Sequence, residues 1–174
     1  MIRVWRVDSA SMNDARAALQ SILQDVAGTP VTLARRSQGK PYLPAAPHIR
    51  FNLSHTRGKA LIAVATEVEV GVDIERHRPV PDFAGIAERY LPPGDAQALQ
   101  DTPEPARERE FFRRWTRAEA LWKAAGVGLL HGAGAIPEGE WDVREIDAGE
   151  GYSAAVAASR AGMEIEISDW GAAT

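Results

Sequence analysis

The sequence predicts an α/β protein made of two similar halves, and three observations support this prediction. Residues 61–65 and 68–75 run apolar or alternate between apolar and polar side chains, as strands do. Residues 106–125 repeat large apolar side chains every three or four positions, which is typical of an amphipathic helix. The order strand, helix, Gly/Pro loop and strands occurs twice. We therefore expect an N-terminal half, residues 1–68, and a C-terminal half, residues 69–174.

Composition indicates a globular protein and excludes several classes of function. The 174 residues suffice for one domain or two small ones, and 45% of them are hydrophobic. The formal net charge of −4 argues against a non-specific nucleic-acid binder, which needs a basic surface. The absence of cysteine excludes disulfides, thiolate catalysis and zinc–cysteine sites. No apolar run approaches the ~20 residues that span a bilayer, and no secretory signal is visible, so we expect a cytoplasmic protein without a membrane partner.

The first half is expected to open with a strand and a long helix. Apolar residues between Ile2 and Val7 suggest the strand, and the polar residues from Ser9 to Asn13 offer helix N-caps. Apolar residues then recur at helical spacing until Gly28 closes the helix. Arg16 lies at the edge of the polar face of this helix, where the spacing alone indicates a solvated arginine.

Two strands are expected next, at residues 31–34 and 48–53, and each is followed by a polar segment. In Gly39-Lys40-Pro41, glycine and proline flank a lysine, so the loop could present its ammonium group to a phosphate or form an ordinary surface turn. In Ser54-His55-Thr56, a histidine stands between two hydroxyls after a strand. It could bind phosphate or transfer a proton, or the segment could be a turn whose polar side chains bond locally.

The stretch Gly71-Val72-Asp73-Ile74-Glu75 combines a strand with two acids. Side chains on a strand alternate between its faces, so Asp73 and Glu75 point the same way while Val72 and Ile74 point into a core. Two neighbouring carboxylates repel each other unless a cation lies between them. The stretch therefore indicates either a divalent-metal site or a solvated sheet face with two ordinary surface acids.

The rest of the second half predicts two helices, a turn and three strands. We expect the helices at residues 82–90 and 106–125, the turn at 96–99, and the strands at 140–146, 152–158 and 163–167. On the long helix, Thr116, Glu119 and Lys123 share one face. They form either an ordinary surface Glu–Lys pair, or a third carboxylate for a cation and a lysine for a phosphate.

Four stretches carry a resemblance that covers the chain from about Arg16 to Ala158. They are Gly39-Lys40-Pro41, Phe51-Asn52-Leu53-Ser54-His55-Thr56, Gly71-Val72-Asp73-Ile74-Glu75, and Trp115-Thr116-Arg117-Ala118-Glu119-Ala120-Leu121-Trp122-Lys123. In this order and spacing they resemble the Sfp-type 4′-phosphopantetheinyl transferases, whose W-x-x-K-E-A-x-x-K pattern corresponds to the last stretch.

The resemblance implies a fold and an activity. The fold is a pseudo-dimer of two similar α/β halves, each a small antiparallel sheet packed with a long helix, with coenzyme A in the cleft between them. The activity is that of a holo-[carrier-protein] synthase. It transfers the 4′-phosphopantetheine arm of coenzyme A to a serine of an acyl or peptidyl carrier protein and releases 3′,5′-ADP. A monomer is expected if the two halves pair within one chain.

The resemblance also implies roles for particular residues. The positions that match metal ligands, for Mg²⁺ or Mn²⁺, are Asp73, Glu75 and Glu119. The positions that match contacts to the nucleotide and its phosphates are Lys40 with Pro41, Ser54, His55, Lys123 and, on the first helix, Arg16. Asp73, Glu119 and Lys123 are the candidate catalytic residues. Glu119 is expected to take the proton of the attacking serine, either directly or through a metal-bound water.

Two departures from the family pattern affect the expected affinity for coenzyme A. The family has a lysine where this chain has Ala118, and Arg117 lies about 100° away around the helix. The segment before the first long helix is also short. A catalytically weakened coenzyme A-binding module is therefore an alternative to the transferase, and a metal-dependent phosphohydrolase using the same acids is another. For an acidic carrier protein, the expected docking residues are Arg76, Arg78, Arg89 and Tyr90; the alternative is an ordinary solvated basic loop.

Overall fold

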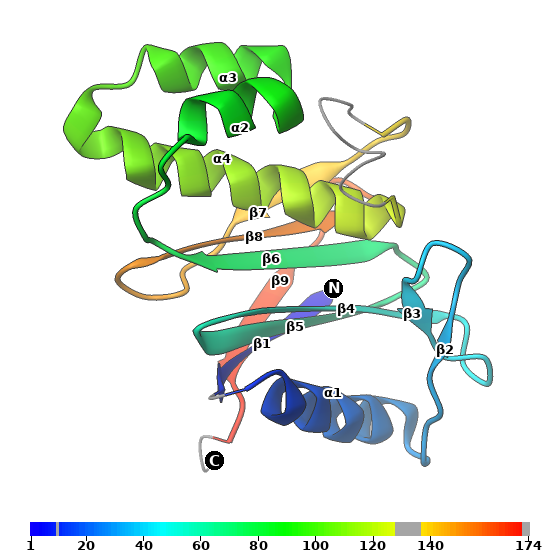
Figure 1. Ribbon diagram of the computed structural model, residues 1–174. Helices are drawn as coiled ribbons and strands as arrows, with labels where there is room; N and C mark the ends of the chain where they lie inside the picture. Colours follow the sequence, from blue (N-terminus) through cyan, green and yellow to red (C-terminus); the bar gives the residue numbers. More distant parts are fainter. Residues whose placement is uncertain (10, 128–136, 172–174) are drawn as a thin grey trace.

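The structure of this protein is a computed structural model, and it describes residues 1–9, 11–127 and 137–171. Its helices and strands form layers (Figure 1). In chain order they are β1 (Ile2–Ser9), α1 (Met12–Ala27), β2 (Ala34–Arg35), β3 (Pro41–Tyr42), β4 (Ile49–Thr56), β5 (Gly58–Thr66), β6 (Val70–Arg76), α2 (Phe83–Tyr90), α3 (Pro93–Gln100), α4 (Glu104–Ala125), β7 (Asp142–Glu145), β8 (Tyr152–Ala158) and β9 (Ile165–Asp169).

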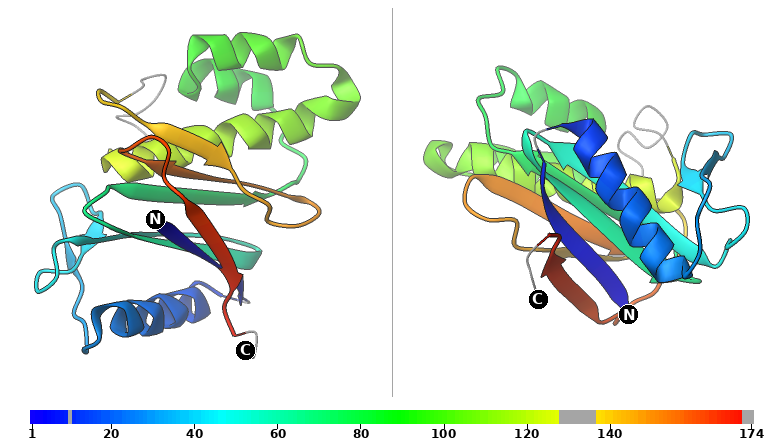
Figure 2. Two further views of the ribbon diagram at one scale, coloured as in Figure 1. Left: turned by 180° about the vertical axis from the view of Figure 1, so that it is seen from behind. Right: turned by 90° about the horizontal axis from the view of Figure 1, so that it is seen from below.

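The N-terminal sheet has the strand order β4-β5-β1-β9 and is covered on one face by α1. The helix begins after Ser11, whose side chain accepts a hydrogen bond from the Asp14 amide, and it ends at Gly28 with a φ of 67°. Its apolar face packs on β1, β4 and β5. β9, near the end of the chain, pairs in parallel with β1, and Figure 2 shows the two strands side by side.

The C-terminal sheet has the strand order β6-β8-β7 and carries α4 on its outer face. The other side of α4 packs against α2 and α3 through an aromatic cluster that includes Phe111, Phe112 and Trp122. The inner faces of the two sheets meet in a shared aliphatic core, to which both β1 and β6 contribute. Val72 and Ile74 lie in this core, which confirms the predicted alternation along β6.

The two sheets repeat one order of elements, although the last strand crosses between them. β1, α1, β4 and β5 give the strand order β4-β5-β1, and β6, α4, β7 and β8 give the strand order β7-β8-β6. The mixed α/β fold with small antiparallel sheets is therefore as predicted. The pseudo-dimer and the boundary between residues 68 and 69 stay predictions, because β9 from the second half completes the sheet of the first.

Several predicted elements differ from the observed ones. β4 does not stop at Leu53 but runs to Thr56, because the hairpin turn lies at Gly58, where φ is 89°. The strand expected at 31–34 is reduced to Ala34–Arg35. The turn expected at 96–99 is a complete helix, α3, which begins at Pro93. Of the helices in the described ranges, none combines the length and the apolar character that crossing a membrane requires.

Candidate functional site

The four motifs meet where the two sheets adjoin, at a place that we call the seam, between β4, β6 and α4. β4 and β6 are edge strands of their sheets, and they lie side by side (Figure 1). Asn52 and Ser54 of β4 each accept a hydrogen bond from a β6 amide, so the polar side of β4 faces the free edge of β6. α4 crosses β6 from the outside. The seam thus brings together one strand of the first half with one strand and one helix of the second.

Gly71 sets how closely α4 approaches β6. A Cβ atom at this position would overlap the carbonyl oxygen of Ala120 and the backbone nitrogen of Ala124. Both alanines are fully buried against the small side chains of β8. The strand and the helix can therefore lie in near backbone contact, and this contact carries Glu119 and Lys123 toward the acids of β6.

Asp73 is the centre of a buried polar cluster. Its side chain is 5% exposed, and its Oδ1 atom accepts hydrogen bonds from Ser54 Oγ at 2.8 Å and from Lys123 Nζ at 2.6 Å. The Lys123 ammonium also lies 3.2 Å from Ser54 Oγ and 3.7 Å from Glu119 Oε2. Residues from β4, β6 and α4 thus share one ammonium group, which offsets the charge of the buried acid.

Three carboxylates lie close enough together to influence one another. Burial raises the pKa of Glu119, Lys123 opposes this rise, and the charges of Asp73 and Glu75 add to it. Glu75 accepts a hydrogen bond from Arg78 at 2.8 Å and a long one from Thr56 Oγ1 at 3.5 Å. The site therefore combines Asp73, which is paired with a cation, Glu119, whose pKa is raised, and the ammonium group of Lys123 that lies between them.

The chemistry of these acids fits a hard divalent cation. Carboxylate oxygens are the ligands that Mg²⁺ prefers, and Asp73 Oδ2 is buried without a hydrogen-bond partner among the described residues. As they are placed here, no three acid, histidine or cysteine side chains in the described ranges stand close enough to hold a metal by themselves. The Lys123 ammonium provides the positive charge between Asp73 and Glu119 instead.

Lys40 lies at the C-terminal end of α4, beside the helical turn that contains Lys123, and is not a free ammonium group. Its Nζ atom donates hydrogen bonds to Glu69 Oε2 at 2.8 Å and to the Ala124 carbonyl, at the last turn of α4, at 2.7 Å. Burial lowers the pKa of Lys40, and Glu69 opposes this effect. Arg36 and Arg50 also approach Glu69, so three cations surround one carboxylate. Pro41, the neighbour of Lys40, begins β3.

His55 and Arg16 are not placed with Asp73. Because β4 continues to Thr56, alternation puts His55 on the opposite side of the strand from Ser54, the side of Phe51 that packs toward α1. His55 Nε2 is buried there with no hydrogen-bond partner in the described structure. Arg16 is exposed on α1, which covers the sheet face away from the seam.

Ala118 stands where the family pattern that the sequence resembles has a lysine. Ala118 is buried in the apolar cluster with Phe111 and Trp122. Arg117 points to β7, where it lies 3.5 Å from Glu145 Oε1 and within hydrogen-bond distance of the Val143 carbonyl oxygen. Arg117 is thus directed toward β7 and not toward the cluster that contains Ala118.

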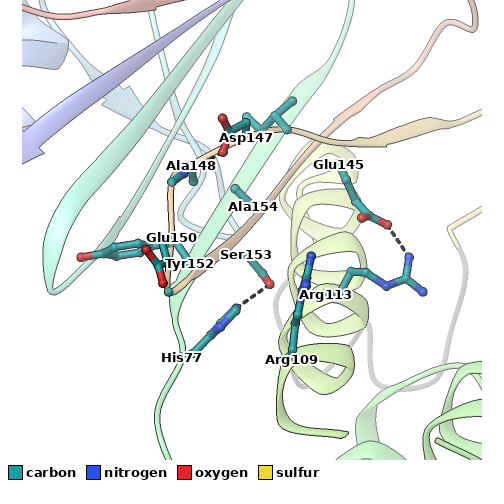
Figure 3. Close-up of a pocket in the computed structure, with 13 residues that line it drawn as sticks. His77, Arg109, Arg113, Glu145, Asp147, Ala148, Glu150, Tyr152, Ser153 and Ala154 are labelled. Atoms are coloured by element: carbon teal, nitrogen blue, oxygen red, sulfur yellow. Dashed lines mark hydrogen bonds and ion pairs between the residues drawn. The ribbon is translucent and has the colours of Figure 1, made fainter. Parts of the chain in front are cut away.

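A cavity of about 640 Å³ lies beyond the end of β6, and no motif pointed to it. His77 and Ser153 line it and share a hydrogen bond of 2.8 Å, and Arg109 and Arg113 of α4 also line it (Figure 3). His77 stacks on Phe112, and burial lowers its pKa. The one available signal was alternation along β6, which places His77 on the same face as Glu75.

Sequence reasoning also left Asn52 and Glu69 without a role. Asn52 is 7% exposed and accepts a hydrogen bond from the Val72 amide, and Glu69 is the common partner of Lys40, Arg36 and Arg50. Asn52 belongs to the motif at residues 51–56, but only the position of β6 shows what its side chain contacts.

Comparison with known proteins identifies relatives of this chain. The model of the 4′-phosphopantetheinyl transferase superfamily matches residues 69–164. The 4′-phosphopantetheinyl transferase HetI of Nostoc sp. is 37% identical over 120 residues, which are 66% of this chain and 51% of HetI. A 4′-phosphopantetheinyl transferase of Bacillus subtilis is 30% identical over 159 residues, 82% of this chain and 69% of that protein. The chain thus spans only about half the length of HetI.

Proposed function

This chain belongs to the 4′-phosphopantetheinyl transferase superfamily, and we propose on that basis that it transfers the 4′-phosphopantetheine arm of coenzyme A to a serine of a carrier protein. The observation that most supports the proposal is that Asp73 of β6 and Glu119 of α4 both lie against the ammonium group of Lys123 at the seam. A site that must handle a pyrophosphate needs such a combination of a cation and acids.

The proposed reaction breaks the phosphoanhydride bond of coenzyme A and forms a phosphate ester with the serine oxygen. The serine oxygen bonds to the phosphorus that carries the pantetheine arm, and the bond from this phosphorus to the bridging oxygen breaks. The electron pair leaves with 3′,5′-ADP. Glu119 receives the serine proton, and its raised pKa favours that acceptance. Lys123 supplies positive charge to the phosphate oxygens.

Asp73, Glu75 and Glu119 are the residues that would hold a divalent cation, Mg²⁺ or Mn²⁺. The unpartnered Asp73 Oδ2 and the oxygen-only set of donors support this assignment. When bound, the ion supplies charge that neutralises the pyrophosphate. Glu119 then has two assigned roles, as a ligand and as a base.

Coenzyme A is the proposed substrate, and Lys40 is the best supported of the remaining contacts to it. The cluster of Lys40, Arg36 and Arg50 around Glu69 carries an excess of positive charge near the C-terminal end of α4. Ser54 contributes through its bonds with Asp73 and Lys123. The proposals for Pro41, His55 and Arg16 rest on the resemblance alone.

The proposed protein partner is an acyl or peptidyl carrier protein. We propose that this protein is a monomer and that it acts in the cytoplasm. Arg76, Arg78, Arg89 and Tyr90 are the proposed docking residues, because an acidic partner would need a local basic patch on a chain with a net charge of −4. Arg78 is 56% exposed although it pairs with Glu75, so docking at this patch would occur beside the candidate site.

A transfer assay tests the proposal. With coenzyme A, Mg²⁺ and apo carrier proteins of fatty-acid, polyketide and peptide-synthetase type, mass spectrometry should show a gain of one phosphopantetheine arm. Asp73→Asn removes the charge that pairs with Lys123, and we expect it to slow transfer by at least about 100-fold.

Asp169→Asn is the matched control, since Asp169 of β9 is 58% exposed and pairs with Arg6 of β1. It should keep the wild-type rate. Transfer at the wild-type rate by Asp73→Asn would reject the assigned site, and no mass gain with any carrier, from folded protein, would reject the function.

A catalytically weakened coenzyme A-binding module is the second candidate. The specific observation in its favour is the buried Ala118, with Arg117 turned toward Glu145, so that the missing lysine is not replaced. Such a module would bind coenzyme A in a calorimeter without modifying a carrier. Release of phosphopantetheine in the absence of a carrier would instead indicate a phosphohydrolase.

A further inference from the structure

Three polar side chains alternate along β4 and meet the free edge of β6. Each accepts a hydrogen bond from one backbone amide of β6, and the three amides alternate as well. The pairs are Asn52 Oδ1 with Val72 N at 2.9 Å, Ser54 Oγ with Ile74 N at 3.3 Å, and Thr56 Oγ1 with Arg76 N at 3.3 Å.

These bonds replace a backbone ladder at this edge. β6 pairs with β8 on its other side, and the described residues show no pairing of its backbone with that of β4. Amides on a buried edge need acceptors, because an unpaired buried N–H group is destabilising. Asn52 and Ser54 are buried, at 7% and 5% exposure, so water is a poor alternative acceptor there.

Two of the three side chains also reach the acids of the candidate site. Ser54 donates to Asp73 Oδ1 at 2.8 Å, and Thr56 donates to Glu75 Oε2 at 3.5 Å. The same hydroxyl groups thus bind the backbone and the carboxylates of β6. Among the described residues, Asn52 makes its side-chain hydrogen bond to the backbone of β6, one residue before Asp73. A shift of β6 along β4 would break all of these contacts together.

We propose that Asn52, Ser54 and Thr56 form a side-chain ladder that positions Asp73 and Glu75 for the reaction. Asn52 and Thr56 are positioning residues, which act through β6. The inference rests on the proposed function for its effect on turnover, but the ladder itself is a property of the fold. It explains why a polar residue occupies every second position of β4 on the side away from α1.

Thr56→Val and Thr56→Ser form a matched pair of tests. Valine keeps the shape of threonine and loses the hydroxyl, whereas serine keeps the hydroxyl. We expect Thr56→Val to lower kcat about tenfold with little change in KM for coenzyme A, and Thr56→Ser to restore kcat. Asn52 bonds to the backbone of β6 and not to a carboxylate, and Asn52→Leu should still lower kcat in the same way.

Amide hydrogen exchange shows whether the ladder exists. In Thr56→Val the Arg76 amide should exchange faster while the Val72 amide stays protected, and in Asn52→Leu the Val72 amide should exchange faster. Unchanged exchange in both variants would overturn the ladder. Faster exchange together with wild-type kcat and KM would overturn its positioning role.

Mn²⁺ binding separates this inference from the proposed function. Measured by electron paramagnetic resonance without coenzyme A, Mn²⁺ affinity should fall in Thr56→Val and stay at the wild-type value in Thr56→Ser. If the wild-type protein transfers nothing to any carrier, the proposed function fails, and this comparison still decides the inference. Equal Mn²⁺ affinities for wild type and Thr56→Val would then overturn it.

Discussion

At the candidate site, the charge of Asp73 is offset by a lysine fifty positions away in the chain. A carboxylate that is only 5% exposed is unfavourable unless it is paired and hydrogen-bonded, and Asp73 Oδ1 has both Lys123 and Ser54 as partners. Glu119 is compensated less well, because the Lys123 ammonium lies 3.7 Å from it and the charges of two other acids raise its pKa. These two acids of one site therefore have different electrostatic environments.

The raised pKa of Glu119 predicts a pH-dependent effect of Glu119→Gln on stability. A carboxyl with a raised pKa in the folded state favours folding while it is protonated, and this contribution is lost as the pH rises from its ordinary value, 4.5, through the raised one. A glutamine side chain does not ionise, so it makes no such pH-dependent contribution. The variant should therefore gain stability relative to wild type as the pH rises, while transfer is abolished.

Thermal unfolding in the presence of a chelator measures this effect. We expect similar Tm values at about pH 4 and a higher Tm for Glu119→Gln at about pH 8. Glu104→Gln is the control, because Glu104 is 77% exposed at the start of the same helix. A Glu119→Gln protein that loses stability as the pH rises would show that the ionised carboxylate stabilises the fold.

Between elements, the contact of β6 with α4 depends on small residues. Gly71 faces Ala120 and Ala124, which pack in turn on Ala155 and Ala157 of β8. Large side chains would hold the helix farther from the sheet and would separate Lys123 from Asp73. The glycine in the motif Gly71-Val72-Asp73-Ile74-Glu75 thus serves helix packing, although its backbone does not have a positive φ.

Gly71→Ala should be strongly destabilising. The added methyl group meets backbone atoms of α4, which cannot rotate away, so the helix must shift. We expect a loss of about 3 kcal/mol in the free energy of unfolding, measured in urea, together with a large loss of transfer activity.

Gly94→Ala is the matched control for this substitution. A Cβ atom at Gly94 meets nothing within 4 Å, and the residue lies in the first turn of α3. Alanine there should be neutral or stabilising by up to about 1 kcal/mol. Equal effects of the two substitutions would show that the close contact at Gly71 has no special importance.

At the scale of the whole molecule, the two sheets depend on each other. They share the core that contains Val4, Leu61, Val72 and Val156, and β9 crosses back to pair with β1. Lys40 connects the loop before β3 to the last turn of α4. A partly unfolded molecule with one intact half would expose the apolar inner face of that half to water.

This interdependence predicts a single cooperative unfolding transition. Urea unfolding followed by tryptophan fluorescence and by far-UV circular dichroism should give the same midpoint. The slowest amides of β5, in the N-terminal sheet, and of β8, in the C-terminal sheet, should report equal free energies of opening by hydrogen exchange. Distinct midpoints, or a clearly lower protection of one sheet, would show that the halves unfold separately.

Much of the fold was predictable because its signals are local. The long helix ends at Ala125 as expected, since apolar spacing and Gly126 act over one or two turns. Alternation placed Asp73 and Glu75 on one face of β6 and Val72 in the core. The extension of β4 through Thr56 was missed, because three polar residues look like a turn until their partners on β6 are known.

The sequence by itself determined the helices α1, α2 and α4, most strands and which acids share a face, because each depends on neighbours within a few positions. Only the tertiary structure decided what these groups contact. Lys123 meets Asp73 across 50 positions, and Lys40 meets the Ala124 carbonyl across 84. Such pairings follow from how closely α4 packs on β6 and how β4 meets its edge, and no local pattern encodes those distances.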